Sequence, residues 1–208
     1  MKDTREKILH TALTLFNRQG LPRVTLRAIA KEMGISQGNL NYHYKKRDEI
    51  IEALYFQLVA RIDMEMEKSA GEESPLEQLF EIMNRIMDSF YEYRFFLLDF
   101  VHIMRENGTI RQHYGKLSQK REKQFKLIFA GLVHGGLMRD ASFAGEHQLL
   151  YKRFQILADF WMASAEAVEK TIDRDTVAAY AQLIAGELYP YLTNKGKEEF
   201  HRLFSLSR

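Results

Sequence analysis

Three amide side chains, Gln37, Asn39 and Asn41, alternate along the stretch TLRAIAKEMGISQGNLNYHY, which spans residues 25–44. An asparagine or glutamine amide can donate to N7 of adenine and accept from its N6 amino group at the same time. Taken singly, each of these amides is more often an ordinary solvated side chain. Together on one short helix, they would suit the edge of a base pair in a DNA groove.

The residues around the amides predict two short helices joined by a tight turn. The first helix covers 25–32, because Leu26, Ile29 and Ala30 recur at the spacing of one apolar helix face. Gly34 can adopt the positive φ that ends a helix, and Ser36 can cap the next one. Leu40 and Tyr44 of the second helix then face inward while the amides face outward. This order is typical of a helix-turn-helix motif.

Positive charge gathers in the same part of the chain. Residues 1–50 hold ten Lys and Arg against five Asp and Glu, a net of +5, whereas the remaining residues have a net of −3. The cations that flank the motif are Arg23, Arg27, Lys31, Lys45, Lys46 and Arg47. A phosphate backbone would pass beside such cations. The first fifth of the chain is therefore predicted to contact nucleic acid.

Residues 3–52 resemble the tetracycline-repressor (TetR) family of bacterial regulators. The resemblance rests on an apolar-faced first helix followed by Gly20, then on Thr25-Leu26-Arg27-x-Ile29-Ala30, Gly34-x-Ser36-x-Gly38-x-Leu40, Tyr42-His43-Tyr44 and Arg47-Asp48-Glu49-Ile50. It covers about a quarter of the chain. Two positions depart from the family pattern, because Asn41 stands where the family often has an aromatic residue and Arg47 where it usually has lysine.

The resemblance implies a role for each matched residue. Those at positions that meet the DNA backbone are Thr25, Ser36, Tyr42, His43 and Arg47, and Lys46 joins them by its charge. Those at or near bases are Arg27, Gln37, Gly38, Asn39 and Asn41. Thr25 and Ser36 have the alternative of being helix caps only, and Gly38 has the alternative of being merely tolerated. Tyr44 is expected in the core.

The composition predicts an all-α protein. A chain of 208 residues can bury a substantial core as one large domain or two small ones. The absence of cysteine excludes disulfides and thiolate metal sites and fits a reducing cytoplasm. No apolar run is long enough for a membrane span, and the N-terminal apolar stretch is too short and charge-broken for a signal peptide. No HExxH, Gly-rich phosphate loop or G-x-S-x-G motif occurs, so we expect neither an enzyme nor a cofactor nor a metal.

Two parts are expected: a three-helix helix-turn-helix module over 1–47 and a helical regulatory and dimerisation domain over 48–208. Asp3 with Glu6 is a plausible capping pair for the first helix. After the module, helices are predicted at 46–68, 75–91, 94–106, 109–134, 145–170, 173–189 and 195–206. Ser74 and Pro75 fit the start of one of them, after a break over 69–75.

The large domain is expected to enclose a small effector molecule, largely apolar and either uncharged or weakly cationic. Its predicted walls are Met83, Met87, Phe96, Phe100, Met104 and Phe129. Asp99 or His102, which interrupt the apolar sequence FFLLDFVHIMR, would be the polar handle. The alternatives are that Asp99 only pairs locally with His102 or Arg105, and that the aromatic residues are ordinary core.

Two late helices carry more apolar residues than one subunit easily buries, which predicts a homodimer contact. The candidates are Leu150, Phe154, Leu157, Trp161, Tyr180, Leu183, Ile184 and Leu188, with the alternative that both helices are core. By resemblance, the protein is expected to be a ligand-responsive repressor that binds a near-palindromic double-stranded DNA operator. The alternatives are a helix-turn-helix protein without a small-molecule ligand and, with less support, a helical-bundle enzyme.

Overall fold

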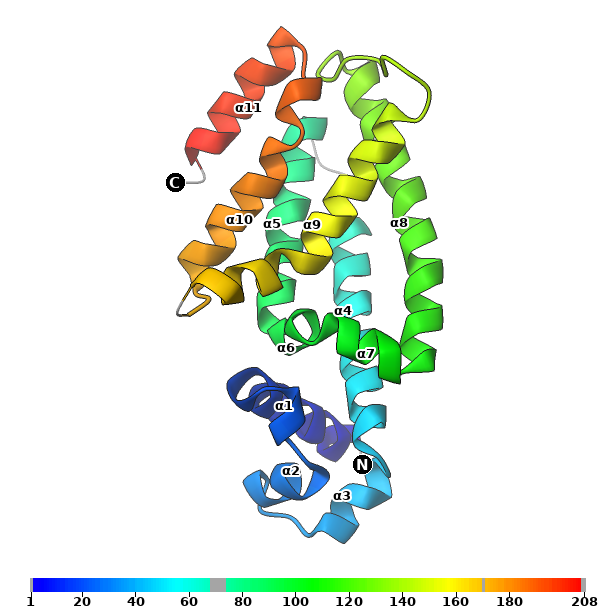
Figure 1. The fold of residues 1–208 in the computed structure, drawn as a ribbon, viewed down its shortest axis with the longest axis vertical. Helices are drawn as coiled ribbons and strands as arrows, with labels where there is room; N and C mark the ends of the chain where they lie inside the picture. Colours follow the sequence, from blue (N-terminus) through cyan, green and yellow to red (C-terminus); the bar gives the residue numbers. More distant parts are fainter. Residues whose placement is uncertain (1, 68–73, 170, 207–208) are drawn as a thin grey trace.

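The structure is a computed structural model of the chain, and it describes residues 2–67, 74–169 and 171–206 (Figure 1). Those residues form helices without any strand, which confirms the predicted all-α fold. The helices are α1 (Lys2–Gln19), α2 (Leu26–Glu32), α3 (Gln37–His43), α4 (Arg47–Glu67), α5 (Pro75–Glu92), α6 (Arg94–Leu98), α7 (Phe100–Glu106), α8 (Gly108–His134), α9 (Glu146–Val168), α10 (Arg174–Gly186) and α11 (Asn194–Leu206). Two single 3₁₀ turns, η1 (Leu21–Arg23) and η2 (Tyr189–Tyr191), complete them. None of the described helices is long and apolar enough to cross a membrane.

Helices α1, α2 and α3 form a small module at one end of the molecule (Figure 1). Its core is a set of fully buried apolar side chains from all three helices and the start of α4: Ile8, Ala12, Phe16, Ile29, Leu40, Tyr44 and Ile50. Helix α4 starts next to α3 in this module and continues into the second part of the chain, where it packs on α5 and α8. Helix α4 therefore belongs to both parts and connects them.

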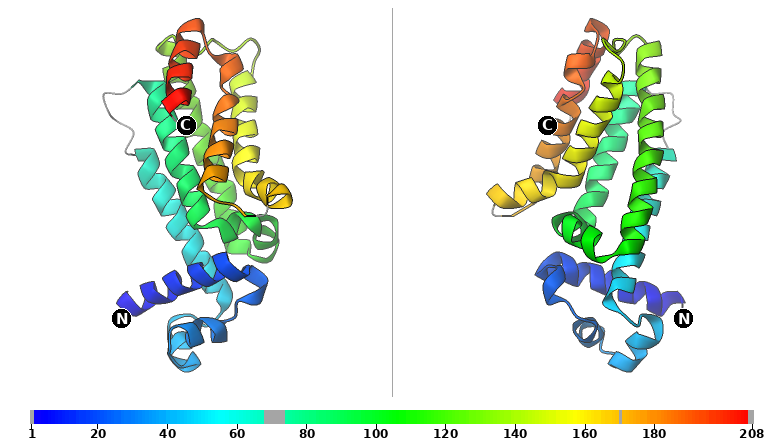
Figure 2. Two further views of the ribbon diagram at one scale, coloured as in Figure 1. Left: turned by 90° about the vertical axis from the view of Figure 1, so that its left-hand side faces the viewer. Right: turned by 45° about the vertical axis from the view of Figure 1, so that its right-hand side comes forward.

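The second part is a bundle in which α4, α5, α8, α9 and α10 run roughly along the long axis of the molecule (Figures 1 and 2). The short helices α6 and α7 lie across the end of this bundle that faces the module. Helix α11 packs on α5. Several helices begin where a local signal predicts: Ser74 Oγ accepts from the Glu77 amide (3.1 Å) at α5, and Asp173 Oδ1 accepts from the Thr176 amide (2.9 Å) at α10.

Three details differ from the sequence-based expectations or lie outside the description. The helix expected over 94–106 is interrupted at Asp99, because Phe95, Phe96 and Leu97 are all buried and three consecutive residues do not share one face of a straight helix. Asp3 lies inside α1 and pairs with Lys7 (2.8 Å) instead of capping the helix. The break predicted over 69–75 lies outside the described residues except for its last two.

The bend between α5 and α6 is bonded to the N-terminal module. The side-chain amide of Asn17 donates to the carbonyl oxygen of Glu92 (2.7 Å) and accepts from the amide of Phe95 (3.1 Å). Next to it, the ring of Phe16 stacks on that of Phe95 with centroids 5.1 Å apart. On the other side, Arg61 of α4 forms an ion pair with the Glu92 carboxylate. Residues 92–95 are therefore held by both α1 and α4.

Candidate DNA-binding surface and ligand pocket

The turn between α2 and α3 has the geometry that its sequence predicts. Gly34 has a φ of 66°, and its amide donates to Lys31 O (3.1 Å) while the next amide, of Ile35, donates to Ala30 O (3.0 Å). Such paired bonds satisfy the last carbonyls of a helix and need a residue that tolerates positive φ. The turn thus fixes the angle at which α3 leaves α2.

Both hydroxyl residues of the motif are helix caps. Thr25 Oγ1 accepts from the Ala28 amide at the start of α2, and Ser36 Oγ accepts from the Asn39 amide at the start of α3, each at 3.1 Å. Both side chains are exposed, and each hydroxyl proton stays available to a further acceptor. The cap role is thus established, and it is compatible with the predicted phosphate contact.

Helix α3 divides cleanly into an inner and an outer side. Leu40 and the residue after the helix, Tyr44, are buried, as the sequence predicts. The predicted base-facing residues of α3 are exposed: Gln37, Gly38, Asn39 and Asn41. Tyr42 is 73% exposed, and the half-buried ring of His43 stands edge-on to it with centroids 5.3 Å apart. The polar side of α3 is therefore free to enter a groove.

The cations near α3 have different surroundings. Arg27, Lys45 and Lys46 are exposed. Arg47 is half-buried, and its Nη1 donates to the carbonyl oxygens of Leu21 (3.1 Å) and Val24 (3.3 Å). It therefore ties the start of α4 to the segment before α2, a structural role that the sequence did not suggest. A phosphate contact by the rest of its guanidinium stays a prediction.

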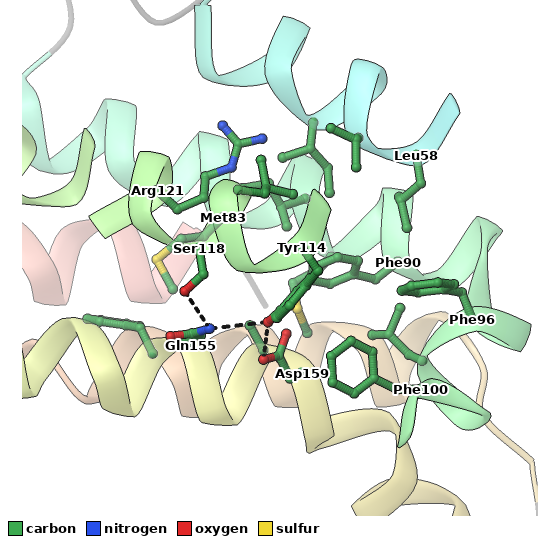
Figure 3. Close-up of a pocket in the computed structure, with 18 of the residues that line it drawn as sticks. Leu58, Met83, Phe90, Phe96, Phe100, Tyr114, Ser118, Arg121, Gln155 and Asp159 are labelled. Atoms are coloured by element: carbon green, nitrogen blue, oxygen red, sulfur yellow. Dashed lines mark hydrogen bonds between the residues drawn. The ribbon is translucent and has the colours of Figure 1, made fainter. Parts of the chain in front are cut away.

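A pocket of about 170 Å³ lies inside the bundle, between α4, α5, α8 and α9, with α6 and α7 at one end (Figure 3). Four of the eight predicted ligand-contacting residues line it: Met83, Met87, Phe96 and Phe100. The other walls are mostly aliphatic and aromatic, which is usual for small-molecule sites. The sequence thus identified a good part of the apolar wall.

The other four predicted residues do not line this pocket, and the structure corrects them. Asp99 lies at the junction of α6 and α7, and His102 is exposed on α7. Met104 packs against the core elsewhere, and Phe129 is buried between Phe125 and Phe154. Asp99 and His102, the two residues predicted to make polar contacts with the ligand, are therefore not part of the pocket lining.

The polar groups of the pocket come instead from α8 and α9. Gln155 Nε2 donates to Ser118 Oγ (2.9 Å) and Tyr114 Oη (3.2 Å), and Tyr114 Oη donates to Asp159 Oδ2 (2.5 Å). Figure 3 shows this row of side chains, with Asp159 beside Phe100. Tyr114 and Ser118 are four residues apart, as are Gln155 and Asp159. Two polar pairs at helical spacing were the signal that sequence reasoning missed.

Burial changes the ionisation of this row. Desolvation raises the pKa of Asp159 to about 6, although the hydrogen bond from Tyr114 and the charge of Lys152 oppose it. Burial, together with the negative charge of Asp159, also raises the pKa of Tyr114. The tyrosine is thus a proton donor at neutral pH, and the carboxylate is held at a cost in stability. Among the described residues, no group of three or more His, Asp or Glu could hold a metal.

The predicted dimer residues are mostly core. Five of the eight are buried within the single chain, so they cannot form the predicted dimer contact: Leu150, Phe154, Trp161, Ile184 and Leu188. Leu157 and Tyr180 are half-buried, and Leu183 is 53% exposed. The large apolar side chains that α9 and α10 leave exposed are Leu149, Ile156, Phe160, Val168 and Leu183. We call these five residues the outer apolar face.

Two family models together match most of the chain. The one described as "Bacterial regulatory proteins, tetR family" matches residues 8–54, and the one described as "Bacterial transcriptional repressor" matches residues 57–200. The first covers α2, α3 and most of α1, and the second covers the helices that surround the pocket. Their limits meet within α4, the helix that both parts share.

Individual proteins agree with these families. The chain is similar to YerO, an uncharacterized HTH-type transcriptional regulator of Bacillus subtilis, with 24% identity over 131 residues, or 61% of this chain and 45% of the relative. The chain thus spans about half of the length of that relative. A TetR-family regulator from Marinobacter aquaeolei has the same fold, with a TM-score of 0.85 and 25% identity over 99% of this chain and 98% of the other. A regulator from Saccharomonospora viridis, solved with choline, has a TM-score of 0.72 and 19% identity over 93% and 100% of the chains.

Replacing Gly38 by alanine should separate folding from DNA binding. An added Cβ would meet no atom closer than Ser36 Oγ at 3.9 Å, so the chain itself has room for it. Because alanine favours helix over glycine, we expect the free energy of unfolding to rise by about 0.5 kcal/mol. If a DNA surface lies against this position, the same methyl group should weaken operator binding by about 1–3 kcal/mol.

Gly115, an exposed residue inside α8, is the matched control for this substitution, since a Cβ there meets no atom within 4 Å. Gly115→Ala should stabilise the chain and leave DNA binding unchanged. Urea unfolding and a gel shift measure the two effects. Full operator affinity of Gly38→Ala would place α3 farther from the DNA than we expect.

Replacing Asp159 by asparagine should stabilise the empty protein in a pH-dependent way. Because the folded pKa of about 6 lies above the ordinary 3.8, the folded chain holds more protons than the unfolded chain between these values, and stability falls as the pH rises through this window. The advantage of the variant in free energy of unfolding should therefore grow by about 2 kcal/mol between pH 4.5 and 7.5. Asp140→Asn, which changes an exposed carboxylate, should show no such trend in the same urea titrations.

Proposed function

The chain belongs to the TetR family of bacterial transcriptional regulators, and we propose that it is a ligand-responsive repressor that binds a near-palindromic operator as a homodimer. The observation that carries the DNA-binding part is the two-sided character of α3. Its apolar residue Leu40 is buried, and its amides stand exposed beside Lys45 and Lys46.

DNA recognition divides between these groups by chemistry. Gln37, Asn39 and Asn41 read base edges in the major groove, where a bidentate amide distinguishes adenine. Thr25, Ser36, Tyr42 and Lys46 hold the phosphate backbone and set the register of α3. Since phosphate contacts carry no sequence information, specificity comes from the amides and from Arg27 beside them.

The pocket is the proposed effector site. Choline in the regulator from Saccharomonospora viridis supports the idea that a chain of this fold takes up a small molecule, although the two chains are only 19% identical. Two connections lead from the pocket to the DNA-binding module. Tyr55 and Leu58 of α4 line the pocket directly, and Phe96 adjoins Phe95, whose ring and amide contact α1.

An effector that displaces these groups alters the position of the module in both subunits. The distance between the two α3 helices then departs from the roughly 34–36 Å that separates successive major grooves. Because the two binding events are linked, operator and effector weaken each other by the same factor. A helix-turn-helix protein controlled without a small molecule would have no use for a pocket with a buried carboxylate.

The outer apolar face supports dimerisation through α9 and α10. Leu149, Ile156 and Phe160 are spaced by seven and four residues, which places them along one side of α9, and Leu183 extends the exposed apolar surface onto α10. Exposed apolar surface of this extent is typical of a protein contact. A two-fold axis through it gives an intersubunit four-helix arrangement.

The direct test of DNA reading uses the amides. Fragments that the protein retains from a pool of genomic DNA supply the operator, and a gel shift measures affinity. Asn39→Ala or Asn41→Ala should each lose about 1–3 kcal/mol on the operator and little on random DNA. Lys46→Ala should weaken both DNAs alike, because it removes a phosphate contact. Equal losses on both DNAs for the asparagine variants would assign them to the backbone or the fold.

The dimer is tested by placing charge on the outer apolar face. Ile156→Glu combined with Leu183→Glu should change the mass in light scattering from twice 24.5 kDa to 24.5 kDa, since burying two carboxylates per subunit is costly. The palindromic operator should then bind much more weakly. Leu127→Glu, which changes a side chain of α8 that is 74% exposed, is the control and should stay dimeric. A wild-type monomer at micromolar concentration would refute the dimer.

A further inference from the structure

We propose that the pocket selects a small aromatic amine in its ammonium form, with Asp159 as the counter-ion. This inference rests on the proposed function only in taking the pocket as the effector site. Three independent features of the lining lead to it: its charge balance, the direction of its hydrogen bonds, and the size and character of its walls.

Within residues 2–67, 74–169 and 171–206, the pocket lining holds one charged side chain without an ion pair, and it is the carboxylate of Asp159. Of the two charged side chains in the lining, Arg121 forms an ion pair with Asp63, with Nη2 and Oδ1 2.6 Å apart, and its Nη1 donates to Gln124 (2.8 Å). Asp63 also pairs with Lys120, whose side chain is 50% exposed. Asp159 forms no ion pair with any cation among the described residues. A largely desolvated carboxylate without a counter-ion is unfavourable, so a bound cation would relieve a cost that the empty pocket carries.

One row of hydrogen bonds, in and beside the lining, ends at this carboxylate. Lys152 Nζ donates to Gln155 Oε1 (3.1 Å), Gln155 donates to Tyr114, and Tyr114 donates to Asp159 Oδ2. Within the described part of the chain, Oδ1 of Asp159 receives no hydrogen bond. A ligand that completes the row must therefore bring a donor, which disfavours an anion and favours an ammonium group, whose donors carry the opposite charge.

The remaining walls fit an aromatic body. Phe90, Phe96, Phe100 and Phe125 line the pocket together with the ring of Tyr114, and Phe100 and Tyr114 stand edge-to-face with centroids 5.2 Å apart. At about 170 Å³, the pocket slightly exceeds the cavity of about 150 Å³ that accommodates benzene in another protein. One ring with a short side chain therefore fills it. Aromatic faces near the carboxylate also attract a cation.

The test compares three compounds of similar size: 2-phenylethylamine, 2-phenylethanol and phenylacetate. Each has a phenyl ring, and they differ in the terminal group, which is an ammonium, a hydroxyl or a carboxylate. Binding to the full-length protein is measured by calorimetry at pH 7.5. We expect the amine to bind most tightly and phenylacetate not to bind. Asp159→Asn should weaken the amine by about 30-fold or more, because it removes one partner of a buried charge pair, and should change the alcohol by less than about threefold.

Asp140→Asn is the matched control, because it removes a carboxylate of the same charge from the protein surface. Binding of the amine should be unaffected by it. Alcohol binding as tight as amine binding, an amine affinity that survives Asp159→Asn, or no binding of the amine would each overturn the proposed ligand class. Amine binding that depends on Asp159 but does not weaken operator binding would leave the ligand class standing and refute the proposed regulation.

Discussion

The side-chain amide of Asn17 joins the DNA-binding module to the bend between α5 and α6. It bonds a carbonyl and an amide of the bend between α5 and α6, so that the C-terminal turn of α1 moves with residues 92–95. The stack of Phe16 on Phe95 adds apolar contact to the same joint. These contacts between α1 and residues 92–95 add a second attachment to the bundle beside the continuous helix α4.

The helix that follows this bend lines the pocket through Phe96 and Leu97. Phe95 and Phe96 are neighbours in α6, yet one packs on α1 and the other stacks on Tyr55 inside the bundle, with centroids 5.2 Å apart. A short helix with buried residues on opposite sides cannot shift on one side and stay still on the other, because protein interiors are close-packed. The break at Asp99 keeps α6 short, in agreement with packing on two sides. As a result, α6 lies between the pocket and the DNA-binding module.

The pocket lowers the stability of the isolated chain, and the outer apolar face contributes little to it. Asp159 is ionised at neutral pH at a cost, and Ile156, Phe160 and Leu183 expose apolar surface to water. Local rules of folding are usually broken where a protein has a function, and here both exceptions lie on α9 or beside it. Phe160 touches both features, since its ring stands edge-on to that of Phe100 in the pocket wall, with centroids 5.7 Å apart. The pocket and the outer apolar face are therefore in physical contact.

The sequence by itself determined the features that depend on one or two helical turns. The caps at Thr25, Ser36 and Ser74, the positive φ of Gly34 and the exposed amides of α3 all follow from residue types at short spacing. Tertiary structure decided what depends on which faces meet. It placed Leu150 and Phe154 in the core, left Ile156 outside, and assembled the polar row of the pocket from two helices that are 45 residues apart between Tyr114 and Asp159. An apolar residue signals that it will be buried, but the partner that buries it is set by the packing of the whole chain, because the hydrophobic effect has no direction of its own.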